Sequence, residues 1–303
     1  MTHPSFAALC PGQCTELAPG LRRVLADNPS ALTGPGTNTY IVGTGRVALI
    51  DPGPESPAHL AAVLAALAPG EIVEAIVVTH AHLDHSALAP RLAAAVRAPV
   101  LAYGTAQEGR NPALAALPDL GGGEGLDLSF RPDARLAEGD TLTGPDWSLR
   151  VLHTPGHLGN HICLAWEDAL FSGDMAMGWA TSIVSPPDGD MTAYMASLAT
   201  LSRQGARVLY PGHGPAVPDA AGRLSELAAH RRQREAQILR ALDMGPATAE
   251  ALARQIYTDL PAALLPAATR NVLAHLLDLQ AGFRVHPHPS ASLSALWRHA
   301  EKT

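Results

Sequence analysis

Along the first two hundred residues, the pattern of apolar and polar positions predicts a series of strands with helices between them. Short runs rich in β-branched residues, bounded by Gly, Pro, Asn or Asp, predict strands. The predicted strands cover residues 21–26, 40–43, 47–51, 73–78, 99–103, 126–130, 147–153, 161–166, 169–172 and 207–210. Segments rich in Ala and Leu predict helices at residues 58–68, 86–96 and 191–203. The pattern predicts an α/β fold class for a first domain, residues 1–218.

After residue 218 the pattern becomes helical. Residues 219–242 form one long amphipathic repeat. Its apolar face carries Leu224, Leu227, Ile238 and Leu242. The remaining predicted elements are a short helix capped by Thr248, a helix at residues 265–281 and a wing strand at residues 283–285. We therefore predict a second, helical winged-helix-like domain over residues 219–303.

The densest group of reactive side chains directly follows the predicted strand at residues 73–78. Within six residues the chain places His80, His82, Asp84 and His85. This loop lies at the carboxyl end of a strand, where α/β folds place their sites. Imidazole nitrogens and carboxylate oxygens together suit zinc, and iron or manganese less exclusively. The segment predicts a metal site rather than a solvated histidine-rich loop, because the same ligand types recur downstream.

Three further candidate ligands each follow an apolar run and have a glycine beside them. They are His157 in Thr-Pro-Gly-His, Asp174 in Ser-Gly-Asp and His213 in Pro-Gly-His-Gly. Glycine lets the backbone turn sharply as it leaves a strand. Through these three motifs and His-x-His-x-Asp-His together, the chain resembles the metallo-β-lactamase superfamily.

The resemblance extends to the second half of the chain. Residues 230–239 resemble the β-lactamase-associated winged-helix domain, and the loop at 28–40 narrows the likeness to the β-lactamase-like protein 2 family. That family includes a metal-dependent single-strand endoribonuclease. The resemblance implies an αββα sandwich followed by a winged-helix domain. It also implies that His80, His82 and His157 bind one metal ion, that Asp84, His85 and His213 bind a second, and that Asp174 bridges both.

The implied chemistry is hydrolysis with two Zn²⁺ per chain, or with Mn or Fe in their place. A hydroxide shared by the ions is the nucleophile, the ions polarise the scissile oxygen, and Asp84 has a catalytic role as well as a ligand role. The substrate is then single-stranded RNA or a small ester, thioester or lactone. His at position 82 favours hydrolysis over the redox chemistry of the similar flavodiiron branch. A mononuclear iron dioxygenase and a non-catalytic binding protein stay as alternatives.

Several nearby residues have two interpretations each. His153 and His161 either support the site or are ordinary strand histidines, and Tyr194 and Tyr210 either donate to an oxyanion or pack in the core. Asn38 and Thr39 are candidates for supporting the metal loop. The basic run Arg231, Arg232 and Arg234 either holds phosphates or is a solvated helix face, with Arg231 paired to Glu235.

Charge and composition limit the kinds of molecule that the protein is expected to bind. The net charge is −7; residues 222–303 carry ten basic and seven acidic side chains (+3), so the rest carries −10. An acidic catalytic part does not favour tight, charge-driven binding of nucleic acid. No apolar run is long enough to span a membrane, and the N-terminus has no secretory signal, so we expect a cytoplasmic protein. The three cysteines, Cys10, Cys14 and Cys163, predict no disulfide framework. Oligomerisation is left open.

Overall fold

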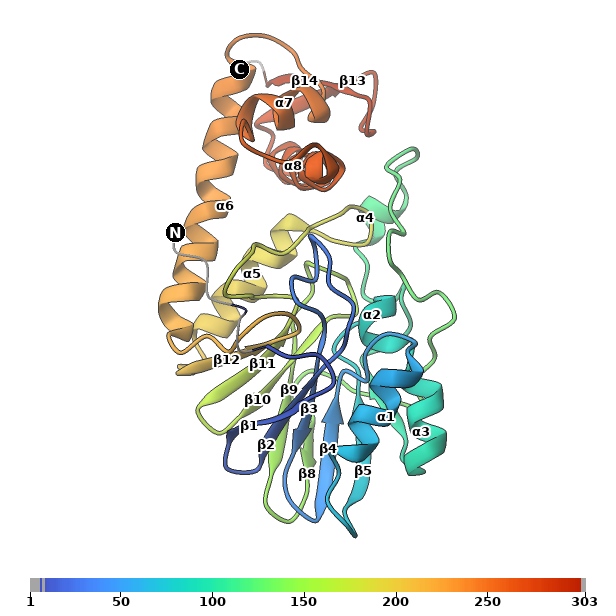
Figure 1. Ribbon diagram of the computed structural model, residues 1–303. Coiled ribbons are helices and arrows are strands. Elements are labelled where there is room, and N and C mark those ends of the chain that lie inside the picture. Colours follow the sequence, from blue (N-terminus) through green and yellow to red (C-terminus); the bar gives the residue numbers. More distant parts are fainter. Residues whose placement is uncertain (1–5, 7–8, 301–303) are drawn as a thin grey trace.

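The computed structural model describes residues 6 and 9–300, and the first part of the chain folds as two facing sheets with helices outside them (Figure 1). The N-terminal five residues, part of the segment without a predicted secretory signal, lie outside the described residues. Layers of this kind, helix–sheet–sheet–helix, confirm the predicted αββα architecture. None of the helices in the described ranges combines the length and apolarity that crossing a bilayer requires.

The first sheet joins seven strands in chain order, antiparallel from β1 to β4 and parallel from β4 to β7. They are β1 (Cys14–Ala18), β2 (Leu21–Leu25), β3 (Asn38–Val42), β4 (Arg46–Ile50), β5 (Ile72–Val77), β6 (Val100–Ala102) and β7 (Ala134–Arg135). The helices α1 (Pro57–Ala65) and α3 (Ala89–Val96) cover its outer face, and α2 (Leu83–Ser86) lies at its end. Ser56 caps α1 by accepting from the His59 amide, with Pro57 at the first helical position.

The second sheet has the strand order β12-β11-β10-β9-β8, with only the β11–β12 pair parallel. Its strands are β8 (Thr141–Thr143), β9 (Ser148–His153), β10 (Ile162–Trp166), β11 (Ala169–Gly173) and β12 (Val208–Pro211). The core between the sheets includes Tyr40 and Ile50 from the first sheet and Leu149, Ile162 and Phe171 from the second. Helix α5 (Met191–Ser202) packs on the outer face of the second sheet, and the short helix α4 (Pro112–Ala115) lies in a connection.

Two sequence predictions are wrong in this part. Residues 126–130 are not a strand: they form turns with a single bridge from Leu126 to His82, and the Asp127 carboxylate accepts from the Ser129 amide and hydroxyl. The apolar Leu126 and Phe130 are buried from a loop instead. The predicted helix at 86–96 is interrupted between α2 and α3, because a proline at position 90 would clash with the carbonyl one turn earlier and cannot donate.

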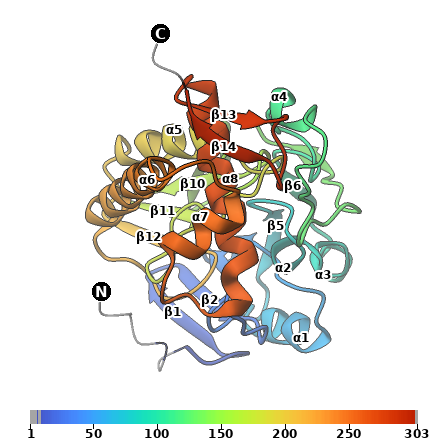
Figure 2. The same cartoon turned by 90° about the horizontal axis from the view of Figure 1, so that it is seen from above.

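The C-terminal part lies over one end of the sandwich (Figures 1 and 2). It contains α6 (Ala220–Leu242), α7 (Ala249–Ile256), the 3-10 helix η1 (Ala262–Leu264), α8 (Leu265–Ala281) and the hairpin β13 (Val285–His288)–β14 (Leu296–His299). Thr248 caps α7 as predicted. The wing strand begins at Val285 rather than at residue 283, because Phe283 is in the left-handed backbone region where the chain turns.

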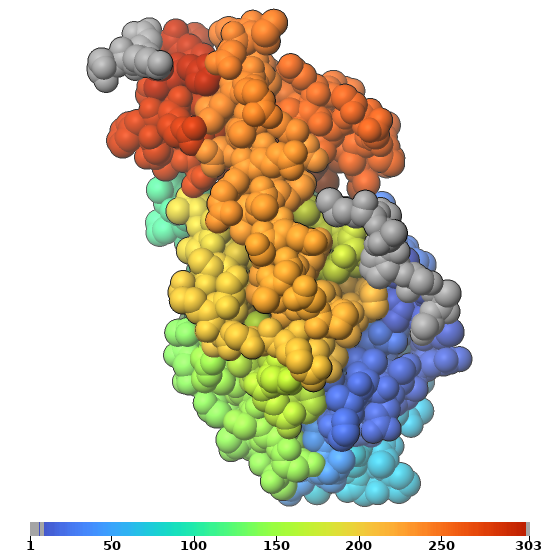
Figure 3. All heavy atoms as spheres, turned by 90° about the vertical axis from the view of Figure 1, so that its left-hand side faces the viewer, coloured from blue at the N-terminus to red at the C-terminus, as the bar shows by residue number. Residues whose placement is uncertain are grey.

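Helix α6 belongs to both parts of the molecule. Its first turns carry Leu224 and Leu227, which pack with α5 against the second sheet. Its last turns carry Ile238 and Leu242, which pack with α7, α8 and Trp297. The space-filling view shows the helix running from the α5 side to the C-terminal part (Figure 3). The predicted domain boundary between residues 218 and 219 stays a prediction. With that boundary, α6 would belong to the second domain, although its first turns pack in the core of the first.

Candidate metal centre

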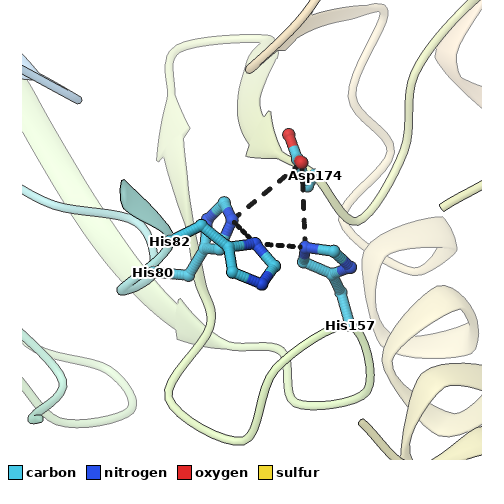
Figure 4. A group of neighbouring side chains, drawn as sticks. All are labelled: His80, His82, His157 and Asp174. Atoms are coloured by element: carbon cyan, nitrogen blue, oxygen red, sulfur yellow. Dashed lines mark hydrogen bonds and ion pairs between the residues drawn. The ribbon is translucent and has the colours of Figure 1, made fainter. Parts of the chain in front are cut away.

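The seven side chains predicted as ligands converge at one end of the two sheets. They come from the segments that follow β5, β9, β11 and β12, and from α2. Within each of two adjoining groups the ligand atoms lie within 4.8 Å of one another: His80, His82, His157 and Asp174 in the first, and Asp84, His85 and His213 in the second. In Figure 4 the four side chains of the first group point towards one another.

Asp174 lies between the two groups. Its Oδ2 atom is 3.7 Å from His157 Nε2 and 3.9 Å from His80 Nε2 in the first group. The same oxygen is 3.4 Å from His213 Nε2, and Oδ1 is 3.5 Å from His85 Nε2. One carboxylate is therefore within a short distance of imidazoles from both groups.

Four of the five imidazoles turn Nε2 into the site and use Nδ1 on the outside. Nδ1 of His157 donates to the Ile183 carbonyl at 2.7 Å, and Nδ1 of His213 donates to the Gly36 carbonyl at 3.1 Å. A carbonyl oxygen only accepts, so the proton of each ring sits on Nδ1. The Nε2 lone pair then faces the site, as in metal-ligating histidines.

Asp51, directly after β4, holds the other two of these rings. Its Oδ2 accepts from His85 Nδ1 at 2.8 Å and from the Thr79 hydroxyl at 2.9 Å, and its Oδ1 accepts from the Thr79 amide. The Thr79 hydroxyl in turn accepts from His80 Nδ1 at 3.0 Å. Sequence reasoning missed Asp51. Its signal is a carboxylate at the carboxyl end of β4, the strand paired in parallel with β5, which leads to the metal loop.

The imidazoles of the first group are held neutral. Burial lowers the pKa of His82 to about 3, and burial likewise holds the pKa of His80 well below its usual value. Burial also lowers the pKa of His157. Neutral imidazole is the form that donates a lone pair to a metal ion.

The second group attracts positive charge. Burial opposes protonation of His85, but the carboxylates of Asp84 and Asp174 outweigh it and raise the His85 pKa to about 9. Burial also opposes protonation of His213, and Asp174 and Asp84 hold its pKa well above the usual value. In the absence of a metal, protons on these rings balance the two carboxylates.

The donor set fits divalent cations. His82 Nδ1 lies 3.0 Å from His80 Nε2 and 3.1 Å from His157 Nε2, and one proton cannot satisfy three converging nitrogens. Asp174 Oδ1 is buried without a hydrogen-bond partner among the described residues. A cation at each group would accept these lone pairs at once, which is the environment that zinc, manganese and iron find in nitrogen and oxygen sites.

The two other histidines differ. His161 stands directly behind the site, where its Nε2 accepts from the Asp174 amide at 3.2 Å. His153 is turned away: it stacks on Tyr103 with ring centroids 3.9 Å apart and donates to the Gly159 carbonyl. The supporting interpretation therefore fits His161, and the ordinary strand interpretation fits His153.

The two tyrosines have structural contacts. The Tyr194 hydroxyl donates to the Met175 carbonyl, and Tyr210 packs against Tyr40 and Phe171 between the sheets. The core alternative therefore describes both residues.

The loop that carries His213 is supported by the start of β3. The side-chain amide of Asn38 donates to the carbonyls of Pro211 and Gly214, each at 2.9 Å. The Thr39 hydroxyl donates to the main-chain carbonyl of Asp51, at 2.6 Å. Asn38 therefore supports the His213 loop and Thr39 the Asp51 segment, whereas the sequence had suggested support of the loop that carries His80 to His85.

The three arginines of the basic run on α6 differ, and neither interpretation describes all of them. Arg231 is buried, so it is neither solvated nor free to hold a phosphate. The expected Arg231–Glu235 pair is wrong, because Glu235 pairs with Arg284 instead. Arg232 is exposed, and Arg234 lies partly buried against an aromatic ring. The face of the helix that packs against α8 decides the placement of Arg231, which a single helical repeat does not reveal.

Comparison with known proteins agrees with the fold. Residues 32–213 match the family model of the metallo-beta-lactamase superfamily, and residues 248–300 match that of the beta-lactamase associated winged helix domain. The chain therefore belongs to the metallo-β-lactamase superfamily and is a hydrolase of that superfamily.

Individual relatives cover most of the chain. A beta-lactamase-like protein 2 homolog from Drosophila melanogaster is 34% identical over 280 residues, covering 88% of this chain and 89% of the relative. An atrochrysone carboxyl ACP thioesterase from Aspergillus chevalieri is 30% identical over 230 residues, covering 75% and 67%. A beta-lactamase domain protein from Burkholderia ambifaria shares the fold, with a TM-score of 0.80, 24% identity and coverage of 98% and 97%.

Proposed function

We propose that this chain is a hydrolase that works with two metal ions, one at each of the two groups. His80, His82 and His157 would hold the first ion, Asp84, His85 and His213 the second, and Asp174 both. The observation that supports this most directly is the position of Asp174, whose carboxylate lies 3.4–3.9 Å from imidazole nitrogens of both groups. Zinc is the proposed metal, with manganese or iron as alternatives.

Two such ions, when bound, generate a nucleophile from water at neutral pH and polarise the oxygen of the scissile group. The protein's own contribution is geometric. Hydrogen bonds from the outer ring nitrogens hold four of the imidazoles in place, and the Asp174 carboxylate places its negative charge between the two groups. Asp84 is the most accessible of the ligand carboxylates, with 28% of its side chain exposed. In this proposal its solvent-facing position lets it accept the proton that water loses during attack.

For the substrate we propose a small acyl thioester or ester, with lactones in the same class. The catalytic part is acidic, and two arginines of the C-terminal part, Arg231 and Arg270, are buried and donate to main-chain carbonyls. These two side chains are therefore not free to hold a phosphate backbone, whose binding draws on basic charge. A relative in Aspergillus chevalieri is named as an acyl carrier protein thioesterase, which agrees in chemical class.

Single-stranded RNA is the second candidate. The resembled family includes an endoribonuclease, and the partial exposure of His82 and Asp84 leaves the site open on one side. An open site admits a polymer strand. Two ions at the site would also neutralise one scissile phosphate without help from arginines.

Metal content and a substrate panel test the proposal. Elemental analysis of protein reconstituted with zinc or manganese should approach two equivalents per chain, and a value that stays near one contradicts the two-ion site. Loaded and chelator-treated protein should then be assayed on an acyl thioester, a lactone, single-stranded RNA and a chromogenic β-lactam. Thioester or lactone cleavage that chelation abolishes supports the proposal. Cleavage of RNA alone at low salt favours the second candidate.

A further inference from the structure

The loop between β11 and α5, residues 174–190, connects the metal centre to the C-terminal helices. It begins with Asp174, and its middle lies against His157, whose Nδ1 donates to the Ile183 carbonyl at 2.7 Å. The Ser182 hydroxyl donates to the carbonyls of Asp174 and Met175. The backbone of this β11–α5 loop therefore helps to set the position of two proposed ligands.

Helix α8 holds the opposite side of the same peptide group. The Val184 amide donates to Asn271 Oδ1 at 3.0 Å. The Ile183 carbonyl and the Val184 amide belong to one peptide bond, which is planar and rigid. The orientation that Asn271 imposes on the amide is consequently the orientation of the carbonyl that holds the His157 ring.

Arg231 of α6 completes the support. It donates to Asn271 Oδ1 at 3.1 Å through Nη1 and to the Ser182 carbonyl through Nη2. Both side chains are buried, Arg231 at 1% and Asn271 at 8% exposure. The Arg231 Nε atom has no hydrogen-bond partner among the described residues, so the buried guanidinium depends on these two directional bonds, and they constrain the loop. Asn271 Oδ1 accepts from two donors, which identifies it as the oxygen of the amide.

A neighbouring residue strengthens the same attachment. Arg270, also buried, donates to the Ser185 hydroxyl at 2.7 Å and to the Pro186 carbonyl. Consecutive residues of α8 thus bind consecutive parts of the β11–α5 loop by polar contacts. Apolar packing alone would allow the loop to slide, whereas these bonds specify its register.

We propose that Asn271 and Arg231 are positioning residues of the metal centre: through the Ile183–Val184 peptide they hold His157 with Nε2 directed into the first group. This assigns the C-terminal helices a role in metal binding, and it rests on the proposed two-metal function. Groups that hydrogen-bond directly to a ligand commonly change metal affinity by about 10–100-fold when lost, and Asn271 acts one peptide group further out, which places its effect at the low end of that range.

A pair of substitutions at one position tests the proposal. Asn271→Leu has a similar volume and removes the acceptor, while Asn271→Asp keeps an acceptor for Val184 and Arg231. We expect Asn271→Leu to bind Zn²⁺ about 10-fold more weakly in competition with a chelating dye, and Asn271→Asp to stay within about two-fold of wild type. The absorption spectrum of bound Co²⁺, which reports ligand geometry, should change only in Asn271→Leu. Arg232→Ala, an exposed neighbour on α6, is the matched control.

Equal zinc affinity in wild type and folded Asn271→Leu would overturn the proposal, and so would an equal loss in Asn271→Asp and Asn271→Leu. Thermal unfolding of the metal-free proteins establishes that each variant is folded. Should Asn271→Leu fail to fold, Arg231→Met against Arg231→Lys decides by the same criteria, because lysine keeps a cationic donor. Failure of the wild type to bind metal would instead refute the proposed function, so the two failures are distinguishable.

Discussion

The direction of each imidazole nitrogen determines, at the scale of single residues, what this site can hold. Carbonyls of Gly36 and Ile183 and the Asp51–Thr79 pair occupy the outer nitrogens, and the inner nitrogens converge around Asp174. The outer partners are ordinary backbone and side-chain acceptors, yet they select one tautomer for each ring. A site with the same histidines and different outer partners would not present these lone pairs together.

Asp174→Ala is expected to lower metal affinity and hydrolysis together. Among the described residues, Asp174 is the only carboxylate that lies close to imidazoles of both groups, so the loss of affinity should exceed the roughly 10–100-fold typical of an outer partner. Metal content after dialysis and kcat/KM on any cleaved substrate measure it. Wild-type turnover by Asp174→Ala would show that the bridging assignment is wrong.

Asp51→Asn tests the support behind both groups. An amide oxygen still accepts one bond, but it loses the charge that faces His85 and the second acceptor for Thr79. We expect zinc affinity to fall about 10–100-fold, with the fold retained in circular dichroism. Asp168→Asn, an exposed carboxylate on the far surface paired with Arg207, is the control and should bind zinc like wild type.

At the scale of helices and strands, some elements are determined by their own sequence and others by tertiary packing. Helix α3 begins at Ala89 with Pro90 in its first turn, a start that is visible in the chain, whereas α8 is shaped by what surrounds it. Nearly every residue from Ala268 to Leu279 in α8 is buried, including polar Arg270, Asn271 and His275. A helix buried on nearly all sides gains its stability from packing rather than from one apolar face.

His275 of α8 should make the protein sensitive to acid. Burial, with the positive charges of Arg231, His230 and Arg234, lowers its pKa to about 3, from 6.5 in an unfolded chain. Between these values the unfolded chain takes up a proton that the folded protein rejects, so stability falls as pH drops below about 6.5. The loss is about 2 kcal/mol at pH 5.

His275→Leu should remove this loss. The Nε2 atom has no hydrogen-bond partner among the described residues, so leucine leaves no acceptor or donor unsatisfied there. Denaturant unfolding at pH 7 and pH 5 measures the difference in the free energy of unfolding. The exposed His286→Leu in β13 is the control. An unchanged difference between the two pH values in His275→Leu would contradict the prediction.

The whole molecule is organised around α6, which contributes to two hydrophobic clusters. The C-terminal part also contacts the β11–α5 loop through buried polar side chains. We therefore expect the winged-helix part to be needed for the stability of the whole chain. The acidic catalytic part and the interior placement of Arg231 and Arg270 agree with the small substrate that we propose.

Truncation after Gly222 should therefore yield a poorly soluble protein. It would expose the apolar residues of α5 and the second sheet that α6 covers, among them Met191, Tyr194 and Leu198, and it would remove both supports of the β11–α5 loop. A large contiguous apolar patch that becomes exposed drives association between molecules. Size-exclusion chromatography with light scattering measures it. A monomeric, fully active fragment would show that the C-terminal part is dispensable.

The sequence by itself determined which residues form the candidate metal centre and predicted most of the elements. The ligands are recognisable because each sits in a short motif after an apolar run, and the strands and long helices follow from local periodicity. Thr248 as a cap and Leu224, Leu227, Ile238 and Leu242 as an apolar face are local features of the same kind. A helix or strand of this type is specified by residues within one or two turns of itself.

Only the tertiary structure decided the rest. Leu126 and Phe130 lie in a loop, but they are buried against side chains from other parts of the chain. Their apolar character therefore resembled the pattern of a strand. Asp51 became a support only when β4 was placed beside β5, and Arg231 became buried only when α8 covered that side of α6. Hydrogen bonds between segments far apart in the chain leave no periodic signal, and the pairing of elements in space therefore determines which polar residues are buried and what they hold.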